Sequence, residues 1–383
     1  MALKTQLRKL YVAEETTYGV DPSANGSAYA YLHGETSLPK FGNEVHKFPA
    51  QNDRLVPSAP IIGAQKATFD LKIPLRASGT PSVPPATPAI ASEIDLILKH
   101  IIGAVTRGQS TAVAGGNAST TNILVTSSTG FVVGMIVYLS TPGTFHYVTA
   151  VPDGTHVTIA PAAAVAPTTG NLVAPSIYTP ADTGHKSLSF TIFVDTLEVT
   201  MLGCHATSGK LSGLGANSVP MLEVAFEADS FSLTTKASLP AANDLFPAVR
   251  PPILKGAPFW IDSTKTVIAG LEFDFGVKGA TLPSTEGTQG RGGFEVVERE
   301  AKGSILPYYA ASFLTDFQAG TDRILAIGWG DGSPPTVNGG GLWIPKGRFL
   351  EPELESRADV LGQKVPFGAY DNGTSPEFAL SLF

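Results

Sequence analysis

Polar and apolar residues alternate along several segments of the chain, and this period of two predicts β-strands with one buried face. Residues 66–76, 221–228 and 267–277 show the pattern most clearly. In the first segment the predicted inward residues are Ala67, Phe69, Leu71, Ile73 and Leu75, and the outward ones include Asp70 and Arg76. In the last segment the predicted inward residues are Val267, Ala269, Leu271, Phe273, Phe275 and Val277.

Residues 185–204 look like one long strand, but the apolar positions change phase in the middle. They are even-numbered from Leu188 to Val194 and odd-numbered from Leu197 to Met201. A one-residue slip turns every following side chain to the other face, so a bulge or a tight turn must lie at Asp195-Thr196. The polar pair between two apolar runs favours a hairpin turn.

Two segments have helical rather than strand periodicity. Apolar residues recur at helical spacing from Ile94 to Val105, after a capping-box variant that begins at Ser92, which predicts a helix packed on a sheet. Residues 306–317 are a shorter helix candidate with Pro307 near its first turn.

The order strand, helix, ribbon, strand occurs twice, on either side of a proline-rich stretch at 238–256. In the second half these elements are expected at 292–305, 306–317, 322–347 and 362–371. Residues 106–180 have few charges and short strand patterns, with a hairpin around Asp153-Gly154, and are predicted to be a small all-β insertion. We therefore predict one module at 1–105 with 181–240, the insertion at 106–180, and a second module at 241–383 that should superpose on the first.

Composition excludes several functions. The chain has 383 residues and a net charge of −7, and the sequence contains no basic patch of the kind that grips nucleic acid. Its single cysteine, Cys204, cannot form an internal disulfide and is expected to be a buried apolar residue. There is no apolar run of signal-peptide or membrane-spanning length, which predicts synthesis in the cytoplasm.

No arrangement of residues points to catalysis. P-loop, His-Glu-x-x-His and Gly-x-Ser-x-Gly motifs are absent from the sequence. His146 and His156 flank the predicted hairpin turn and could meet across strands, but a third metal ligand is not evident, so a structural role is favoured. We predict a protein that is not an enzyme, with no catalytic residues, metal or cofactor.

Several blocks resemble the tail tube (major tail) proteins of long-tailed bacteriophages. They are residues 7–22 with their Glu-Glu-Thr-x-x-Gly segment, 52–104, 185–212, 296–309 and 339–347. The individual motifs are short, and their order along the chain is the specific part. The ribbon turn departs from the family pattern, being Asp195-Thr196 rather than Asp-Gly.

The resemblance implies a mainly β fold of tail-tube-like β-sandwich or barrel modules, each with one packed helix. It implies a structural virion protein of the phage tail, made in the host cytoplasm, that assembles into stacked rings around a channel for DNA. The implied partners are further copies of the chain, the tape-measure protein, the tail terminator and tail-tip proteins, and genome DNA in transit without specific binding. Two modules per chain favour a homotrimer with pseudo-sixfold symmetry, with a homohexamer as the alternative.

An acidic channel wall would repel phosphates and so would not retain DNA. The candidate residues are acidic and lie on the polar faces of predicted strands, although ordinary solvated faces explain each one as well. They are Asp70, Glu198, Glu223, Glu227, Glu272 and Asp274.

Two other functions remain open. Another virion component, such as a capsid decoration or tail-tip protein, would share the composition but would not form tubes. A carbohydrate-active β-sandwich would need clustered aromatic residues, whereas Trp260, Trp329 and Trp343 are dispersed.

Overall fold

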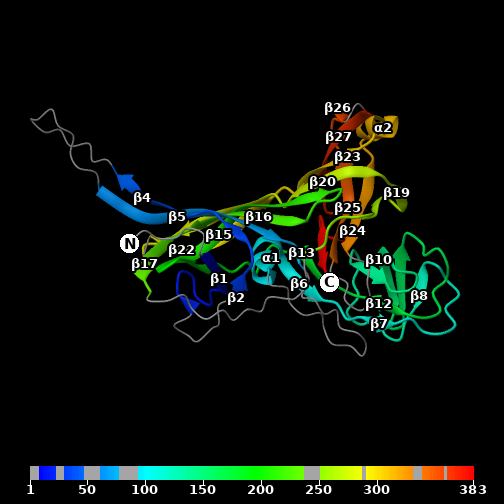
Figure 1. Ribbon diagram of the computed structural model, residues 1–383, viewed down its shortest axis with the longest axis horizontal. Helices are drawn as coiled ribbons and strands as arrows, with labels where there is room; N and C mark the ends of the chain where they lie inside the picture. The colour runs from blue at the N-terminus through cyan, green and yellow to red at the C-terminus, as the bar shows by residue number, and fades with distance from the viewer. Residues whose placement is uncertain are drawn as a thin grey trace, which may run out of the picture.

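The computed structural model describes residues 8–22, 30–46, 61–76, 94–236, 251–286, 290–330, 339–357 and 360–383. Across these residues antiparallel strands predominate and two α-helices are present, which confirms the predicted mainly β fold (Figure 1). Neither helix is long and apolar enough to cross a membrane.

The first half of the chain begins with a sheet whose members are far apart in sequence. Its order is β2–β1–β14–β15–β17. The bounds are β1 (Arg8–Glu14), β2 (Ala30–Leu32), β14 (Leu188–Val194), β15 (Leu197–Gly215) and β17 (Ser230–Thr235). All of β14 is buried, because its apolar residues face the core and Phe193 packs edge-on against Tyr11.

The predicted hairpin within 185–204 is confirmed. Val194 lies opposite Leu197, so Asp195 and Thr196 form a two-residue turn. Asp195 has φ 55°, a left-handed conformation that aspartate tolerates better than most residues. A bulge is also present in this ribbon, but it lies further along β15, between Met201 and Cys204.

A second layer covers the same core. Beyond its bulge, β15 continues into a sheet of order β4–β5–β16–β15, with β3 beside β5. The bounds are β3 (Glu35–Thr36), β4 (Lys40–His46), β5 (Ile61–Pro74) and β16 (Met221–Ala228). The inward faces of β5 and β16 are as predicted, except that Arg76 is buried, with its guanidinium 3.4 Å from the His33 carbonyl oxygen, rather than in water.

Helix α1 (Asp95–Ile102) packs against these layers through the predicted apolar stripe as far as Ile101, but it ends before Val105, which lies on a strand. It begins two residues later than a cap at Ser92 would place it, and Ser92 lies outside the described residues. Asp95 in the first turn accepts hydrogen bonds from Tyr178 at 2.7 Å and from Arg107, and pairs with Lys99 at 3.0 Å. Burial alone would raise the pKa of Asp95, but these three partners lower it.

The second half contains further strands of the large sheet, the separate two-stranded sheet β21–β22 and the short helix α2 (Ala311–Ala319). The bounds are β18 (Phe259–Ile261), β19 (Thr264–Thr266), β20 (Ile268–Asp274), β21 (Val277–Pro283), β22 (Arg291–Arg299), β23 (Lys302–Pro307), β24 (Asp322–Gly330), β25 (Gly339–Phe349), β26 (Glu353–Arg357), β27 (Val360–Ala369) and β28 (Ala379–Leu382).

Two local predictions for this half are wrong. Val267 is 68% exposed and Ala269 is also exposed, because an extra residue between Ile268 and Leu271 shifts the pairing of β20 with β23 and reverses the faces before it. Pro307 ends strand β23 and does not lie in the first turn of α2.

Residues 111–173 form a separate six-stranded sheet, at the lower right of Figure 1. Its bounds are β7 (Thr111–Ala112), β8 (Asn122–Leu124), β9 (Ile136–Leu139), β10 (Thr144–Asp153), β11 (His156–Ala160) and β12 (Asn171–Val173). The predicted hairpin is present, with Asp153 opposite His156. The strands that flank this sheet, β6 (Gly103–Arg107) and β13 (Ser176–Pro180), pair with each other, and β13 also pairs with β28.

The second half repeats the strand pairing of the first. The order β1–β14–β15–β16–β5 has its counterpart in β18–β24–β25–β27–β23. Helix α1 lies in the connection from β5 to β14, and α2 lies in the equivalent connection from β23 to β24. The bulge in β15 opposite Ser189 matches one in β25 opposite Ile324. A single core cluster runs through both halves.

Candidate channel-lining face

One sheet passes through both halves and has a continuous polar face. Its order is β5–β16–β15–β20–β23–β27, and the two halves meet where β15 pairs with β20. Along every strand alternate residues enter the core, as Leu211 of β15 and Phe273 of β20 do. The residues between them therefore share the opposite, polar face.

Five of the six predicted acidic residues lie on this face. Asp70 is on β5, Glu223 and Glu227 are on β16, and Glu272 and Asp274 are on β20. Glu198 is not among them, because it lies on the part of β15 that pairs with β14 and β17. There it faces the same way as Phe193, and its carboxylate contacts Thr234 at 2.6 Å and Lys236 at 3.1 Å.

The polar face also carries lysines, which the prediction of an acidic wall did not include. They lie on β5, β15, β23 and β27 and are Lys66, Lys72, Lys210, Lys302 and Lys364. On these strands five lysines thus accompany five acidic residues, so the described part of the face carries mixed charge.

Glu223 is the centre of the best-defined charge cluster on this face. Its carboxylate lies 2.9 Å from Lys72 Nζ and 3.0 Å from Lys210 Nζ, and it accepts a 2.7 Å hydrogen bond from Ser212. The hydrogen bond from Lys72, together with those from Ser212 and Lys210, lowers the pKa of Glu223 to about 2 despite partial burial. Its negative charge is thus shared by two lysines over the whole neutral range.

The other acids on the face differ in their partners. Glu227 pairs with Lys66 and lies 3.6 Å from Arg291. Asp274 accepts a 2.8 Å hydrogen bond from the Gly276 N–H, while Asp70 and Glu272 are exposed.

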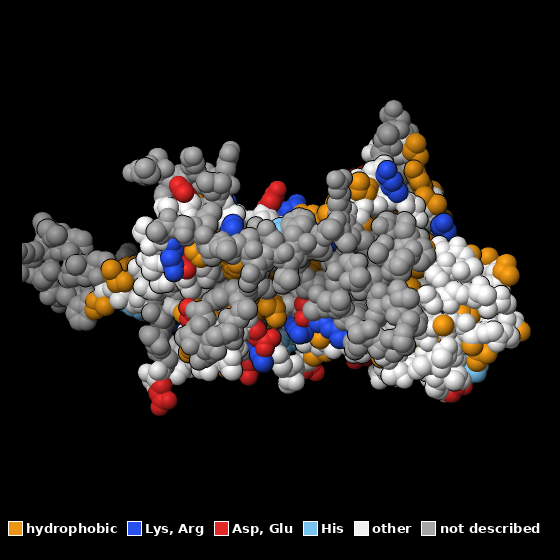
Figure 2. All heavy atoms as spheres, turned by 60° about the horizontal axis from the view of Figure 1, so that its bottom comes forward, with side chains coloured by type: hydrophobic (Ala, Val, Ile, Leu, Met, Phe, Trp, Pro, Cys, Tyr) orange, Lys and Arg blue, Asp and Glu red, His pale blue; other side chains and the backbone are white. Residues whose placement is uncertain are grey.

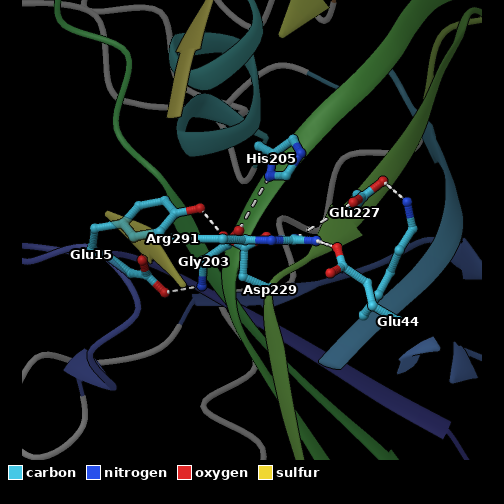
Figure 3. Close-up of polar contacts among 9 residues, drawn as sticks. Glu15, Glu44, Gly203, His205, Glu227, Asp229 and Arg291 are labelled. Atoms are coloured by element: carbon cyan, nitrogen blue, oxygen red, sulfur yellow. Dashed lines mark hydrogen bonds and ion pairs between the residues drawn. The ribbon is translucent and has the colours of Figure 1, made fainter. Parts of the chain in front are cut away.

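A partly buried charge cluster lies at one end of the face (Figure 3). Arg291, at the start of β22, pairs with Glu227 of β16, with Asp229 directly after that strand, and with Glu44 of β4 at 3.5 Å. Burial opposes ionisation of Arg291, but Asp229, Glu227 and Glu44 raise its pKa. Arg291 belongs to the second half and its acidic partners to the first, so the cluster joins the two halves.

Two further side chains extend this cluster inward. Tyr18 donates a hydrogen bond to Asp229, and burial, followed by this contact, raises the pKa of the phenol. Glu15 accepts hydrogen bonds from Ser187, Ser189 and the Gly203 N–H, at 2.5, 2.7 and 2.8 Å, and burial raises its pKa. Glu15 and Tyr18 belong to the Glu-Glu-Thr-x-x-Gly segment, which is therefore a support for β15 at its bulge.

The candidate metal ligands do not come together. Buried His146 contacts Thr144 and the Pro161 carbonyl, whereas His156 contacts Asp153 at the turn. Across the described ranges, no group of three or more His, Cys, Asp or Glu side chains is placed to hold a metal ion. Cys204 is fully buried, and burial raises its pKa well above the ordinary value, as expected of a structural cysteine.

A family model described as "Phage tail tube protein" matches residues 5–369. The chain belongs to this family and is a structural protein of the phage tail. No curated protein is significantly similar to the chain.

Proposed function

We propose that the chain assembles into rings whose stacking forms the tail tube, with the polar face of β5–β16–β15–β20–β23–β27 lining the channel. The observation that carries the proposal is this single sheet, which crosses both halves with one face on the core and the other polar. Closing such a sheet into a barrel of several copies removes its edges.

The division into modules supports a particular ring. We propose tail-tube modules at 1–105 with 181–240 and at 241–383, with 106–180 inserted between strands of the first. The repeated strand order and bulge position support this division. Two modules per chain favour a homotrimer with pseudo-sixfold symmetry over a homohexamer.

The charges of the face suit a channel for DNA. A protein retains DNA when free lysines and arginines replace the counterions of the phosphates. Here Lys66, Lys72 and Lys210 are paired with Glu227 and Glu223. We propose that these lysines are thereby neutralised, and that Asp70, Glu223, Glu227, Glu272 and Asp274 prevent DNA from adhering. The same channel would hold the tape-measure protein, and the tail terminator and tail-tip proteins would bind the tube ends.

Electron microscopy of the purified full-length chain tests this function. Tubes of uniform width with a central hole are expected as the concentration is raised. Particles that stay monomeric at every concentration would contradict the proposal, and isolated capsid-binding particles would favour a decoration protein.

A further inference from the structure

The joint between the two halves contains more than paired strands. We define the first arm as the hairpin of β4 with residues 61–66 of β5, and the second arm as the hairpin of β21 with β22. The second arm lies on the first half: besides Arg291, its Phe294 stacks on His100 and His205, with ring centroids 5.4 and 4.8 Å away. Arg299 also donates to the Ile102 and Ala181 carbonyls, at 3.3 and 3.2 Å.

The first arm has the same design but less cover: Phe41 packs on Phe231 of β17, with ring centroids 4.5 Å apart, and Glu44 pairs with Arg291 at 3.5 Å. Both arms have a one-residue bulge at the same place, so that Val45 opposite Ile62 corresponds to Gly279 opposite Val296. The second arm has another register shift, between Leu282 and Pro283. Val296 packs against the main core, whereas Ile62 is 68% exposed. In Figure 1 the first arm projects from one end of the molecule, and α2, β26 and β27 form a tip at the other end.

At the tip, β25 and β26 pair with β27 in the same way as β15 pairs with β16 where β15 also contacts β20 of the second half. Ala206 opposite Phe226 corresponds to Phe349 opposite Phe367, and in each case an extra residue follows on the first strand. Lys210 opposite Glu223 then corresponds to Glu353 opposite Lys364, and Leu211 corresponds to Leu354. Leu211 is 1% exposed beside Phe273 of β20, but Leu354 is 66% exposed.

The edge that would meet the tip follows from the same comparison. In the second half Asp274 lies opposite Lys302, and in the first half Lys40 lies opposite Thr68. Lys302 pairs with Gly368, the residue after Phe367, and Thr68 pairs with Glu227, the residue after Phe226. Since the two phenylalanines are equivalent, Lys302 and Thr68 are equivalent too. Lys40 is therefore the counterpart of Asp274.

The internal joint places Lys210 opposite Asp274. At the equivalent joint between two copies, Glu353 would lie opposite Lys40, which is the same pair with the charges exchanged. Glu353 and Lys40 are both exposed, and neither forms an ion pair with any residue that the structure describes. Within the described ranges β26 pairs with β27 alone, and β3 and β4 with β5 alone. Figure 2 shows hydrophobic side chains at both of these ends of the molecule.

We infer that the β26 edge of one copy pairs antiparallel with the β3–β4 edge of a second copy, in the register that places Glu353 opposite Lys40, and that the first arm of the second copy covers the tip. The contact is heterologous, because two different surfaces meet. If the joint within each chain and the joint between copies each rotate the next module by one-sixth of a revolution, three chains close into a ring. The inference rests on the proposed function and adds which surfaces meet and in what register.

Paired cysteines test the register. Glu353→Cys with Lys40→Cys in one full-length chain is expected to form covalent dimers and trimers on oxidation, because Cα atoms of opposed antiparallel residues lie within disulfide range. The native Cys204 is buried and does not interfere. The control combines Lys40→Cys with Val165→Cys, an exposed residue between β11 and β12, and is expected to stay uncrosslinked.

Charge exchange is the second readout. Glu353→Lys or Lys40→Glu alone is expected to weaken ring formation about tenfold, and the double exchange to restore it. Rescue together with specific crosslinking supports the inference. If the wild-type chain forms rings but shows neither, the inference is overturned while the tube function stands. If the wild-type chain forms no rings at all, the proposed function and this inference both fail.

Discussion

The two arms of the chain have similar strand pairing but opposite surroundings. The second arm is covered by the first half, where Phe294 contacts two histidines and Arg291 enters a partly buried charge cluster. The first arm keeps apolar residues such as Val45 and Ile62 exposed. Since the second arm is buried against the first half of the same chain, we expect the exposed first arm to be covered by another copy of the chain.

Replacing Arg291 should produce the largest effect on the closed joint. Arg291→Ala leaves Asp229 without its cation in a partly buried site and Glu227 with Lys66 alone, which should cost about 3–5 kcal/mol of unfolding free energy. The matched control on the same arm is Lys278→Ala, which removes only the exposed pair with Glu298 and should cost far less. Equal losses in urea unfolding would show that the cluster does not hold the joint.

The pair Leu211 and Leu354 separates the closed joint from the open edge. Leu211→Ala should reduce unfolding free energy by about 2–5 kcal/mol, because it leaves a cavity in the core. Leu354→Ala should leave the stability of the isolated chain unchanged but reduce ring formation. Sedimentation velocity and urea unfolding of both variants make the comparison. A large stability loss from Leu354→Ala would mean that the edge is already covered within one chain.

Acid should destabilise the region around His100, on which Phe294 of the second arm stacks. Nε2 of His100 accepts a 2.8 Å hydrogen bond from the Ala206 N–H, and Nδ1 lies 2.6 Å from the Lys186 carbonyl oxygen. Because Nε2 must carry no proton to accept this bond, the ring is held neutral. Burial lowers its pKa to about 4, against an opposing contribution from the Lys186 carbonyl, and His185 and His205 lower it further. Between about pH 6.5 and 4 the unfolded chain therefore binds more protons at this residue than the folded chain does. The free energy of unfolding accordingly decreases as the pH is lowered, by on the order of 3 kcal/mol.

The variant His100→Gln isolates this contribution. Its unfolding free energy should fall less between pH 7 and 4.5 than that of the wild type, measured in urea. Comparing the two proteins removes the effect of Glu15, whose raised pKa acts in the opposite direction. Parallel pH profiles would contradict the assignment to His100.

The smallest effect is expected outside both arms, at the β14–β15 turn. Asp195→Gly should stabilise the chain by roughly 0.5–1 kcal/mol, because glycine adopts positive φ without the steric cost of a Cβ atom. Asp195→Asn should change little, since asparagine tolerates the same conformation. A destabilised glycine variant in thermal unfolding would show that the aspartate side chain holds the turn.

Local patterns predicted the local structure well. The inward faces of β5 and β16, the stripe of α1 and the hairpin at Asp195-Thr196 each depend on residues close in sequence, where periodicity is informative. The bulge between Ile268 and Leu271 reversed two positions because nothing in the alternation marks an extra residue. Tertiary context also decided the burial of Arg76.

The candidate site was predicted in part. Alternation identified five acidic residues that share the polar face, but it could not show that Glu198 belongs to another sheet, because β15 passes through both. The lysines were visible in the same segments, yet their pairing with Glu223 and Glu227 depends on which strands are neighbours. The contact between β15 and β20 joins segments about 60 residues apart and has no local sequence signal.

The number of chains per ring is the most direct test of the account. Cryo-electron microscopy of assembled tubes should show three chains per ring, with six similar modules around the channel and the sheet continuous through Glu353 and Lys40 of adjacent copies. Rings of six chains, or rings in which β26 and β3 face away from every neighbour, would contradict it.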